Sequence, residues 1–381
     1  MAPTTRRRSL LLAAAATTLA PRAAFAAADT LTIAQVAPLS GVLATTGQQM
    51  VLGGKVCFDA VNARGGVHGA QIRTLVADDG YKVADTLRLT REMVARPEVV
   101  ALFGFAGSAN VGKLLEEDVL ATAGIALVAP YTGGELLRNP FNPWIFHLRA
   151  GYADEAEHIV EQLNTMGITR MALLYQDDAF GKSGLDGVEA ALRRRGQKLV
   201  VSAGYPRNTG DVADAVRRIV AAQPQSVIMI AVNKPAAAFA RQYRAAGGGA
   251  QLFNISVVDP AELVKLGGIE NVRGLGISQV VPYPYRPSLP VVREFQAALK
   301  KHAPGAEVNY TNFEEYLGAK VLVEALRRAG PKPSRAQVIA ALESLRSFDL
   351  GGVTVSYGPK ERVGSRYVEV TVIGGEGKLL K

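Results

Sequence analysis

The sequence has few of the residues that build covalent cross-links and metal sites. It contains one cysteine, Cys57, so no disulfide can form within the chain, and a thiolate metal site would need more than one. The histidines also lack the close spacing of a metal-binding pair. We therefore expect no metal and no cofactor. The four histidines are His68, His147, His158 and His302.

The signatures of common enzymes are also missing. No Gly-x-Ser-x-Gly nucleophile elbow occurs in the chain. The stretch 177–184, DDAFGKSG, imitates a phosphate-binding loop, but the glycine that such a loop needs five positions before Gly181 is Gln176. With no nucleophile and base to act together, we expect a protein that is not an enzyme and has no catalytic residues.

Long apolar runs are confined to the start of the chain. Residues 1–26 combine a basic head, a short apolar stretch and the small-residue cleavage site Ala24-Phe25-Ala26, which is typical of a secretory signal peptide. The apolar stretch is shorter than the ~20 residues of a membrane span. The pair Arg7-Arg8 leaves a twin-arginine route and an ordinary export route open. No cysteine stands directly after the cleavage site, so we expect a soluble periplasmic protein without a lipid anchor.

The mature chain also carries only a small excess of positive charge. Removal of the four signal-peptide arginines lowers the formal net charge from +9 to +5. The basic runs 193–195 and 327–328 stand just before Gly196 and Gly330, as expected for cations at helix C-termini. Aromatic residues do not alternate with the basic ones, as a base-stacking surface requires. We therefore expect no nucleic-acid partner.

The rest of the chain alternates strand and helix patterns. A first series predicts strands over 30–37, 71–79, 99–104 and 124–129, and helices that end near residue 62, over 83–95 and over 108–122. A second series predicts helices over 152–166, 182–195, 210–222 and 235–246, and strands over 170–178, 198–204, 226–232 and 251–256. The tail predicts helices over 288–301, 310–329 and 334–345, then strands over 351–358 and 365–375. This rhythm is typical of parallel βαβ units, so the sequence predicts an α/β protein with two doubly wound lobes.

Polar, Gly-rich loops follow the strands of both series. In open α/β sheets ligands bind at the carboxyl ends of the strands, where helix N-termini favour anions. Three loops come from each lobe, which indicates a ligand held between the lobes. By contrast, Asp78-Asp79 is typical of a turn and helix cap. The six loops are 38–47, 104–111, 129–135, 176–184, 232–236 and 256–260.

The motifs P-L-S-G, N-x-x-G-G-V-x-G and V-x-A-L-F-G stand in the stretch 37–104, and YQDDAFGKSGLDGV follows later. With these motifs, the mature chain resembles periplasmic solute-binding proteins of the branched-chain amino-acid type. The resemblance implies a type I periplasmic binding fold: two Rossmann-like lobes joined by a three-crossing hinge, with the ligand in the interlobe cleft. We expect crossings near 148–151, 277–282 and 346–350. The lobes expected are 27–148 plus 281–346 and 149–280 plus 347–381.

The resemblance also implies a function. Relatives are substrate-binding subunits of ABC importers that capture an amino acid or an aromatic or aliphatic carboxylate by lobe closure and deliver it to a membrane permease. We expect a monomer in the same role. The alternative is a sensor of the same fold that signals to a receptor or regulator.

The resemblance carries site residues onto this chain. Ser108 falls where relatives place a Ser hydroxyl on the ligand carboxylate. Tyr131 and Thr132 fall in the loop that supplies a carbonyl and a Thr, and Phe180 falls where relatives often have Tyr. The ligand-binding residues expected are Ser40, Gly41, Ala106, Gly107, Ser108, Tyr131, Thr132, Phe180, Asn233, Lys234, Val257 and Asp259.

One departure from the pattern bears on the ligand. Amino-acid binders place an acid near the stretch 254–260 to pair with the ligand ammonium, and this chain has Val257 and Val258 there. Either Asp259 or Asp178 takes that part, or the ligand has no amino group, because a buried ammonium without a counter-charge is costly. The positive net charge and Lys234 favour a carboxylate without an amine.

Overall fold

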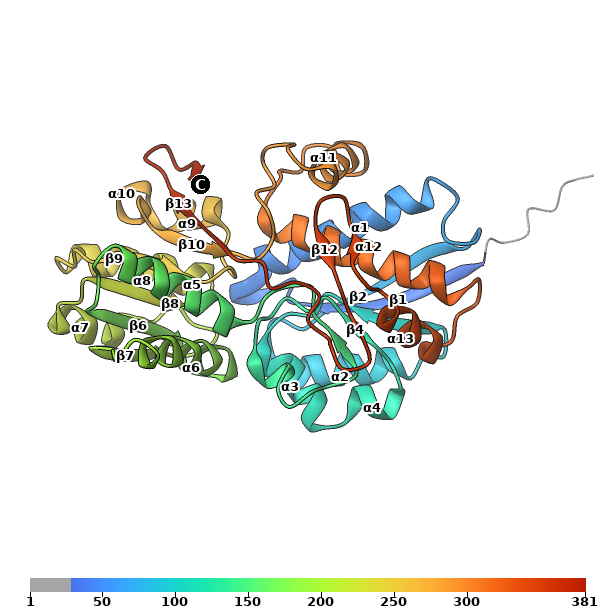
Figure 1. Ribbon diagram of the computed structural model, residues 1–381, viewed down its shortest axis with the longest axis horizontal. Coiled ribbons are helices and arrows are strands. Elements are labelled where there is room, and N and C mark those ends of the chain that lie inside the picture. Colours follow the sequence, from blue (N-terminus) through green and yellow to red (C-terminus); the bar gives the residue numbers. More distant parts are fainter. Residues whose placement is uncertain (1–28) are drawn as a thin grey trace, which may run out of the picture.

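Two parallel β-sheets form the cores of two lobes that lie side by side (Figure 1). The computed structural model describes residues 29–381, so the signal peptide expected over residues 1–26 lies outside the described part. Helices cover both faces of each sheet, which is why β3 (Val99–Phe103) and β8 (Ser226–Ile230) are apolar along nearly their whole length. The α/β fold with two doubly wound lobes is therefore confirmed.

The first lobe combines an early part of the chain with a late one. Its early elements are β1 (Thr30–Ala37), the 3-10 helix η1 (Gly41–Leu43), α1 (Ala44–Asn62), β2 (Gln71–Asp78), α2 (Val83–Val94), β3, α3 (Ser108–Glu116), α4 (Val119–Ala123), β4 (Leu127–Val128), the 3-10 helix η2 (Glu135–Leu137) and β5 (Ile145–Phe146). Its late elements are α11 (Pro290–His302), α12 (Tyr310–Ala329), α13 (Arg335–Glu343) and the hairpin of β11 (Phe348–Asp349) and β12 (Thr354–Val355).

The first sheet has the strand order β2-β1-β3-β4-β5, and all of its neighbouring strands are parallel. α2, α3 and α4 cover one face, and α1, α11, α12 and α13 pack on the other. α12 lies beside α1 although the two are far apart in sequence (Figure 1). The strand order changes direction between β1 and β3, and such switch points are where open α/β sheets bind ligands.

The second sheet has the order β14-β13-β10-β9-β8-β6-β7, with a parallel body and an antiparallel edge formed by β13 and β14. Its switch point lies between β6 and β8. The elements of this lobe are α5 (Tyr152–Thr165), β6 (Met171–Gln176), α6 (Ala179–Arg193), β7 (Val201–Tyr205), α7 (Ala213–Ala222), β8, α8 (Asn233–Ala245), β9 (Gln251–Asn254), α9 (Pro260–Gly267), α10 (Ile269–Val272), β10 (Gly276–Gln279), β13 (Glu369–Ile373) and β14 (Leu379–Leu380).

Three chain crossings lie next to one another between the lobes. In the first and third, His147 N donates to the Arg362 carbonyl and Gly364 N donates to the His147 carbonyl, both at 2.8 Å. The second follows β10, which pairs with β13 of the third. The hinge of three crossings that the family resemblance implied is present in the structure.

We propose that the third crossing leaves the first lobe later than the expected 346–350. Leu350, Val355 and Tyr357 are buried in the hydrophobic cluster of α1 and α12, because the β11–β12 hairpin packs on that face. We therefore propose lobes of 29–148 plus 281–357 and 149–280 plus 366–381, joined in part by the linking residues 358–365.

Several element boundaries differ from the pattern-based ones. The helix expected over 108–122 is interrupted, because Asp118 adopts a left-handed backbone with φ of +51° between α3 and α4. α6 begins at Ala179, before the expected residue 182, because the Asp178 side chain caps it by accepting from Phe180 N. α9, α10 and the four-residue strand β10 were not anticipated. No helix within residues 29–381 combines the length and apolarity that a membrane crossing requires.

Candidate ligand-binding cleft

The switch points of the two sheets face each other across a cleft between the lobes. A small cavity there is lined by side chains of both lobes. Its volume is about 10 Å³, close to the space of one water molecule, so the lobes are in contact across the cleft. A ligand would bind between them with the lobes further apart. The lining residues are Leu43, Tyr81, Gly107 and Tyr131 of the first lobe and Tyr152, Phe180, Val232 and Val257 of the second.

Polar contacts also join the lobes around this cavity. The Tyr131 hydroxyl donates to the Ser256 carbonyl at 3.3 Å. The Ser183 hydroxyl accepts from Glu135 N at 2.9 Å, on the side of η2 and α6. Leu43, Tyr81 and Tyr131 also belong to the hydrophobic cluster of α5 and α6 in the second lobe. The lobes are therefore closed on each other through both apolar and polar contacts.

Ser108 is the first residue of α3 and has no exposed surface. Its Oγ lies 2.7 Å from the Thr132 Oγ1, and Thr132 Oγ1 accepts from Gly134 N at 3.1 Å. The preceding Gly107 has φ of +92°, a conformation that glycine adopts without strain, and it lines the cavity. This arrangement places two hydroxyls and a helix N-terminus, all suited to a carboxylate, next to the cavity.

Tyr81 is held in a strained conformation at the cavity wall. It is a bulky residue with φ of +62°, which costs free energy unless its surroundings hold it there. The Asp79 carboxylate accepts from Tyr81 N at 2.9 Å. From the second lobe, Arg207 Nη2 donates to the Tyr81 carbonyl at 2.8 Å and to Asn110 Oδ1 at 2.6 Å. The guanidinium also lies 4.3 Å from the centre of the Tyr81 ring.

A buried ionic network lies behind Tyr131. Arg149, in the first crossing, is fully buried, with Nε 3.4 Å from the Glu314 carboxylate and Nη2 4.0 Å from that of Glu155. Its guanidinium also lies over the Tyr131 ring, 4.7 Å from the ring centre. The Glu155 carboxylate also accepts hydrogen bonds from the backbone N–H and hydroxyl of Ser256 and from the hydroxyl of Ser278. The network joins α12, the hinge and the second lobe.

Burial shifts the pKa values of the carboxyl groups in this network. Desolvation raises the pKa of Glu314 to about 7, although the Arg149 guanidinium opposes the shift. Desolvation and the neighbouring Glu314 charge also raise the pKa of Glu315, on the same helix, well above its ordinary value. Neither carboxylate oxygen of Glu315 has a hydrogen-bond partner. Burial therefore disfavours the charged form of both groups relative to an exposed glutamate.

Four of the twelve residues expected from the sequence line the cavity: Gly107, Tyr131, Phe180 and Val257. Ser108 and Thr132 lie beside them, and a backbone bridge joins Ala106 to Tyr131. Asn233 instead joins the lobes, because its Nδ2 donates to Thr46 Oγ1 in the first lobe at 3.3 Å.

The remaining four expected residues, Ser40, Gly41, Lys234 and Asp259, do not line the cavity. Ser40 and Gly41 are exposed, and the Asp78 carboxylate accepts from Ser40 N at 3.2 Å. Lys234 is exposed and lies against the Gly210 loop.

Neither aspartate considered for an ammonium reaches the cavity. Asp259 caps α9 by accepting from Glu262 N at 2.9 Å. Asp178 caps α6 and lies 3.4 Å from Arg207 Nη1. Both carboxylates are therefore committed to helix ends or an ion pair, and the side chain that faces the cavity from this loop is Val257.

Sequence reasoning missed the lining residues Leu43, Tyr81, Tyr152 and Val232. Leu43 and Val232 each lie in or beside a loop that the sequence singled out, but an apolar residue there gave no polar signal. Tyr81 follows Asp78-Asp79, which was interpreted as a turn and cap only. Tyr152 begins α5 directly after the first crossing, and its position over the cleft depends on the hinge. Within the described part of the chain, no group of three or more His, Cys, Asp or Glu side chains is placed to hold a metal ion.

Comparison with known proteins places this geometry in context. A family model described as periplasmic binding protein matches residues 30–377. A curated relative, Leu/Ile/Val-binding protein homolog 7 of Brucella abortus (strain 2308), is 26% identical over 391 aligned positions, which cover 94% of this chain and 92% of that protein.

Solved structures share the fold over nearly the same range. A substrate-binding periplasmic protein from Ralstonia solanacearum is 41% identical with a TM-score of 0.88, covering 92% of this chain and 99% of that one. A possible leucine/isoleucine/valine-binding protein from Rhodopirellula baltica SH 1 is 27% identical with a TM-score of 0.88, covering 93% of this chain and 97% of that one.

Proposed function

The chain belongs to the periplasmic binding protein family, with relatives among the leucine/isoleucine/valine-binding proteins, and on that premise we propose that it is the substrate-binding subunit of an ABC importer for a small carboxylate without an amino group. It is a binding protein, not an enzyme. Beyond its family, we propose the class of its ligand, a membrane permease as its partner, a periplasmic location and a monomeric state.

The composition of the cavity wall carries the proposal. Four of its eight lining residues are aromatic, and no Asp or Glu is among the eight. An ammonium buried there would lose its hydration without gaining a counter-charge, which is costly. The acids Glu155 and Glu314 lie behind Tyr131 in the ionic network of Arg149 and do not line the cavity. These features favour an apolar or aromatic ligand body.

The other end of the ligand would bind at α3. The hydroxyls of Ser108 and Thr132 and the first N–H groups of α3 would donate to a carboxylate, and the helix dipole adds to that attraction. Closure of the lobes over the ligand would remove it from water. A closed complex of this kind is stabilised as far as the ligand binds the closed form better than the open one, and it is the form we expect the permease to accept.

Calorimetric titration of the mature protein with leucine and with 4-methylpentanoate, its deaminated analogue, tests the ligand class. We expect 4-methylpentanoate to bind tighter by a factor of about ten or more, because leucine would bury an unpaired ammonium. Tighter binding of leucine would exclude the proposed class.

The variant Val257→Asp sharpens this test, because it places a carboxylate at the cavity wall. We expect it to weaken 4-methylpentanoate by charge repulsion and to reduce or reverse the preference over leucine. Val257→Asn is the matched control, since it is similar in size and polarity but uncharged. Equal effects of the two substitutions would mean that charge at this wall does not select the ligand.

A further inference from the structure

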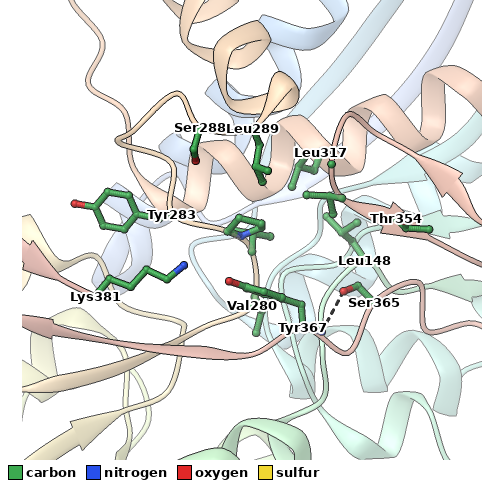
Figure 2. A pocket seen from close by; sticks show the side chains of 14 residues that line it. Leu148, Val280, Tyr283, Ser288, Leu289, Leu317, Thr354, Ser365, Tyr367 and Lys381 are labelled. Carbon is green, nitrogen blue, oxygen red and sulfur yellow. Dashed lines mark hydrogen bonds between the residues drawn. The ribbon is translucent and has the colours of Figure 1, made fainter.

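A second and larger cavity lies on the hinge, outside the ligand cleft. Its volume is about 370 Å³, which falls within the roughly 300–1,000 Å³ of small-molecule sites. Each chain crossing contributes to its wall: Leu148 from the first, Val281 from the second and Tyr367 after the third. Leu289 and Leu317 close it from the first lobe (Figure 2). None of its lining residues also lines the cleft cavity.

The wall of this hinge cavity is mostly apolar. Figure 2 shows Leu289 and Leu317 on one side, with Val280 and Tyr367 opposite them. Hydroxyl groups lie at its edge, on Ser288, Thr354 and Ser365. The full set of apolar and aromatic lining side chains is Leu148, Val280, Val281, Pro282, Tyr283, Leu289, Leu317, Val353 and Tyr367.

Cations lie at one end of the hinge cavity. A neighbouring hollow of about 360 Å³ shares Tyr283, Ser288 and Lys381 with it and adds Arg286. Arg286 and Lys381 are the charged side chains that line the two hollows within residues 29–381, and no Asp or Glu side chain of that range lines either. The Lys381 ammonium lies 2.5 Å from Glu369, whereas the guanidinium of Arg286 is exposed and has no ion-pair partner in the described chain.

We propose that the hinge cavity is a second binding site, which takes a small amphipathic carboxylate. The apolar body of this molecule lies against Leu148, Leu289 and Tyr367, where it removes apolar surface from water. Its carboxylate lies at the end marked by Arg286, whose guanidinium is complementary in charge, whereas the ammonium of Lys381 is paired with Glu369. A cationic molecule does not fit, because the nearby Glu369 carboxylate is already neutralised by Lys381.

The position of the site links it to lobe closure. Since segments of all three crossings form the wall, a change in the angle between the lobes changes the shape of the hinge cavity. A molecule that fills the cavity at one angle then stabilises that angle, and by reciprocity the cleft ligand changes the affinity of the hinge site by the same factor. This site is separate from the proposed function of the cleft.

The test uses calorimetric titration of the mature protein with octanoate, and with 1-octanol and octylammonium as neutral and cationic counterparts. We expect octanoate to bind tightest. Two sets of variants then locate its site. Thr354→Trp, at an exposed position on the rim, fills the hinge cavity and should lower octanoate affinity by about tenfold through lost apolar contact. The double variant Arg286→Ala, Lys381→Ala should lower it by roughly threefold to fivefold, the range of exposed charge pairs.

Two control variants separate the hinge from other sites. Lys378→Ala removes an exposed lysine of the same hairpin that lines neither hollow and should leave octanoate affinity unchanged. Octanoate also fits the ligand class proposed for the cleft, and Ser108→Ala should weaken only octanoate bound there. It should leave the affinity of the hinge site unchanged, so failure of this proposal and failure of the proposed function are distinguishable. No binding of octanoate, equal binding of octylammonium, or binding that neither Thr354→Trp nor the double variant weakens would overturn the inference. The double variant alters two exposed side chains and keeps the test decisive if Thr354→Trp fails to fold.

Discussion

Ser108 and Ser40 illustrate how residues of the same type acquire different parts. Both are serines that follow a strand of the first sheet and precede a helix, and both were expected to bind the ligand. Ser108 is fully buried beside the cavity and lies 2.7 Å from Thr132 Oγ1. Ser40 is exposed, and its backbone N–H is committed to Asp78.

We expect Ser108→Ala to weaken a bound carboxylate by ~1–2 kcal/mol, the range of a hydrogen bond to a charged group. The amide of the same acid should lose less, because it carries no charge. Calorimetry with 4-methylpentanoate and 4-methylpentanamide measures both losses. Ser40→Ala is the matched control and should leave both affinities unchanged. Equal losses for acid and amide in Ser108→Ala would argue against a carboxylate at α3.

At the scale of the element, α12 is a core helix over its first half and not an amphipathic helix with one exposed face. Nearly the whole first half of this helix is buried, including the adjacent pair Glu314 and Glu315. Its first turn reaches the cleft, where Thr311 Oγ1 lies 3.1 Å from the Tyr131 hydroxyl. The helix therefore carries two acids into the core between the sheet of the first lobe and the hinge.

The buried acids of α12 predict a pH dependence of stability. Because desolvation raises the pKa of Glu315 well above its ordinary value, the folded state keeps a proton that the unfolded state loses above pH ~4.3. The contribution of this group is full below that pH and is lost as pH rises toward the folded-state pKa. For Glu314 the corresponding window runs from about 4.5 to about 7.

Glu315→Gln removes the titration at this position. We expect its free energy of unfolding to exceed that of the wild type at pH 8 by roughly 1–3 kcal/mol, because the wild type must take up a proton or bury a charge at this position whereas the glutamine is neutral, and by less at pH 5. Urea denaturation at the two pH values measures the difference. Glu324→Gln, on the same helix but paired with Arg328 at 2.9 Å, is the control and should not stabilise the protein at pH 8. A variant no more stable at pH 8 than the wild type would contradict the prediction.

At the scale of the whole molecule, Arg207 links the two lobes at the edge of the cleft. It is anchored in the second lobe beside Asp178 and binds the Tyr81 carbonyl and Asn110 in the first. These contacts exist when the lobes are closed and would be broken by hinge opening. They therefore stabilise the closed form whether or not they touch the ligand.

We expect Arg207→Ala to shift the lobes toward the open form and to weaken ligand binding by roughly 1–3 kcal/mol, because two hydrogen bonds from a charged group are lost. Calorimetry measures the affinity, and small-angle X-ray scattering should report a larger radius of gyration for the free variant. Arg218→Ala is the control, since that exposed arginine binds the Ser202 carbonyl within one lobe. An unchanged affinity together with an unchanged radius would mean that Arg207 does not hold the lobes together.

Local pattern was enough to identify most elements and part of the site. Apolar strands of five residues, such as β3 and β8, were found because parallel strands covered on both faces are apolar along nearly their whole length. The strand β10 carries too few residues for a period to be read. The kink at Asp118 also escaped notice, because a left-handed residue at that point depends on packing.

The sequence by itself determined the alternation of strands and helices, the loops that carry the site and the two valines at positions 257 and 258, where an acid was expected, since each depends on neighbouring residues. Only the tertiary structure decided which of these residues meet. Tyr81, Tyr152 and Arg207 converge on the cleft because a hinge of three crossings brings two sheet edges together. Such contacts join positions about a hundred residues apart, and no local period records them.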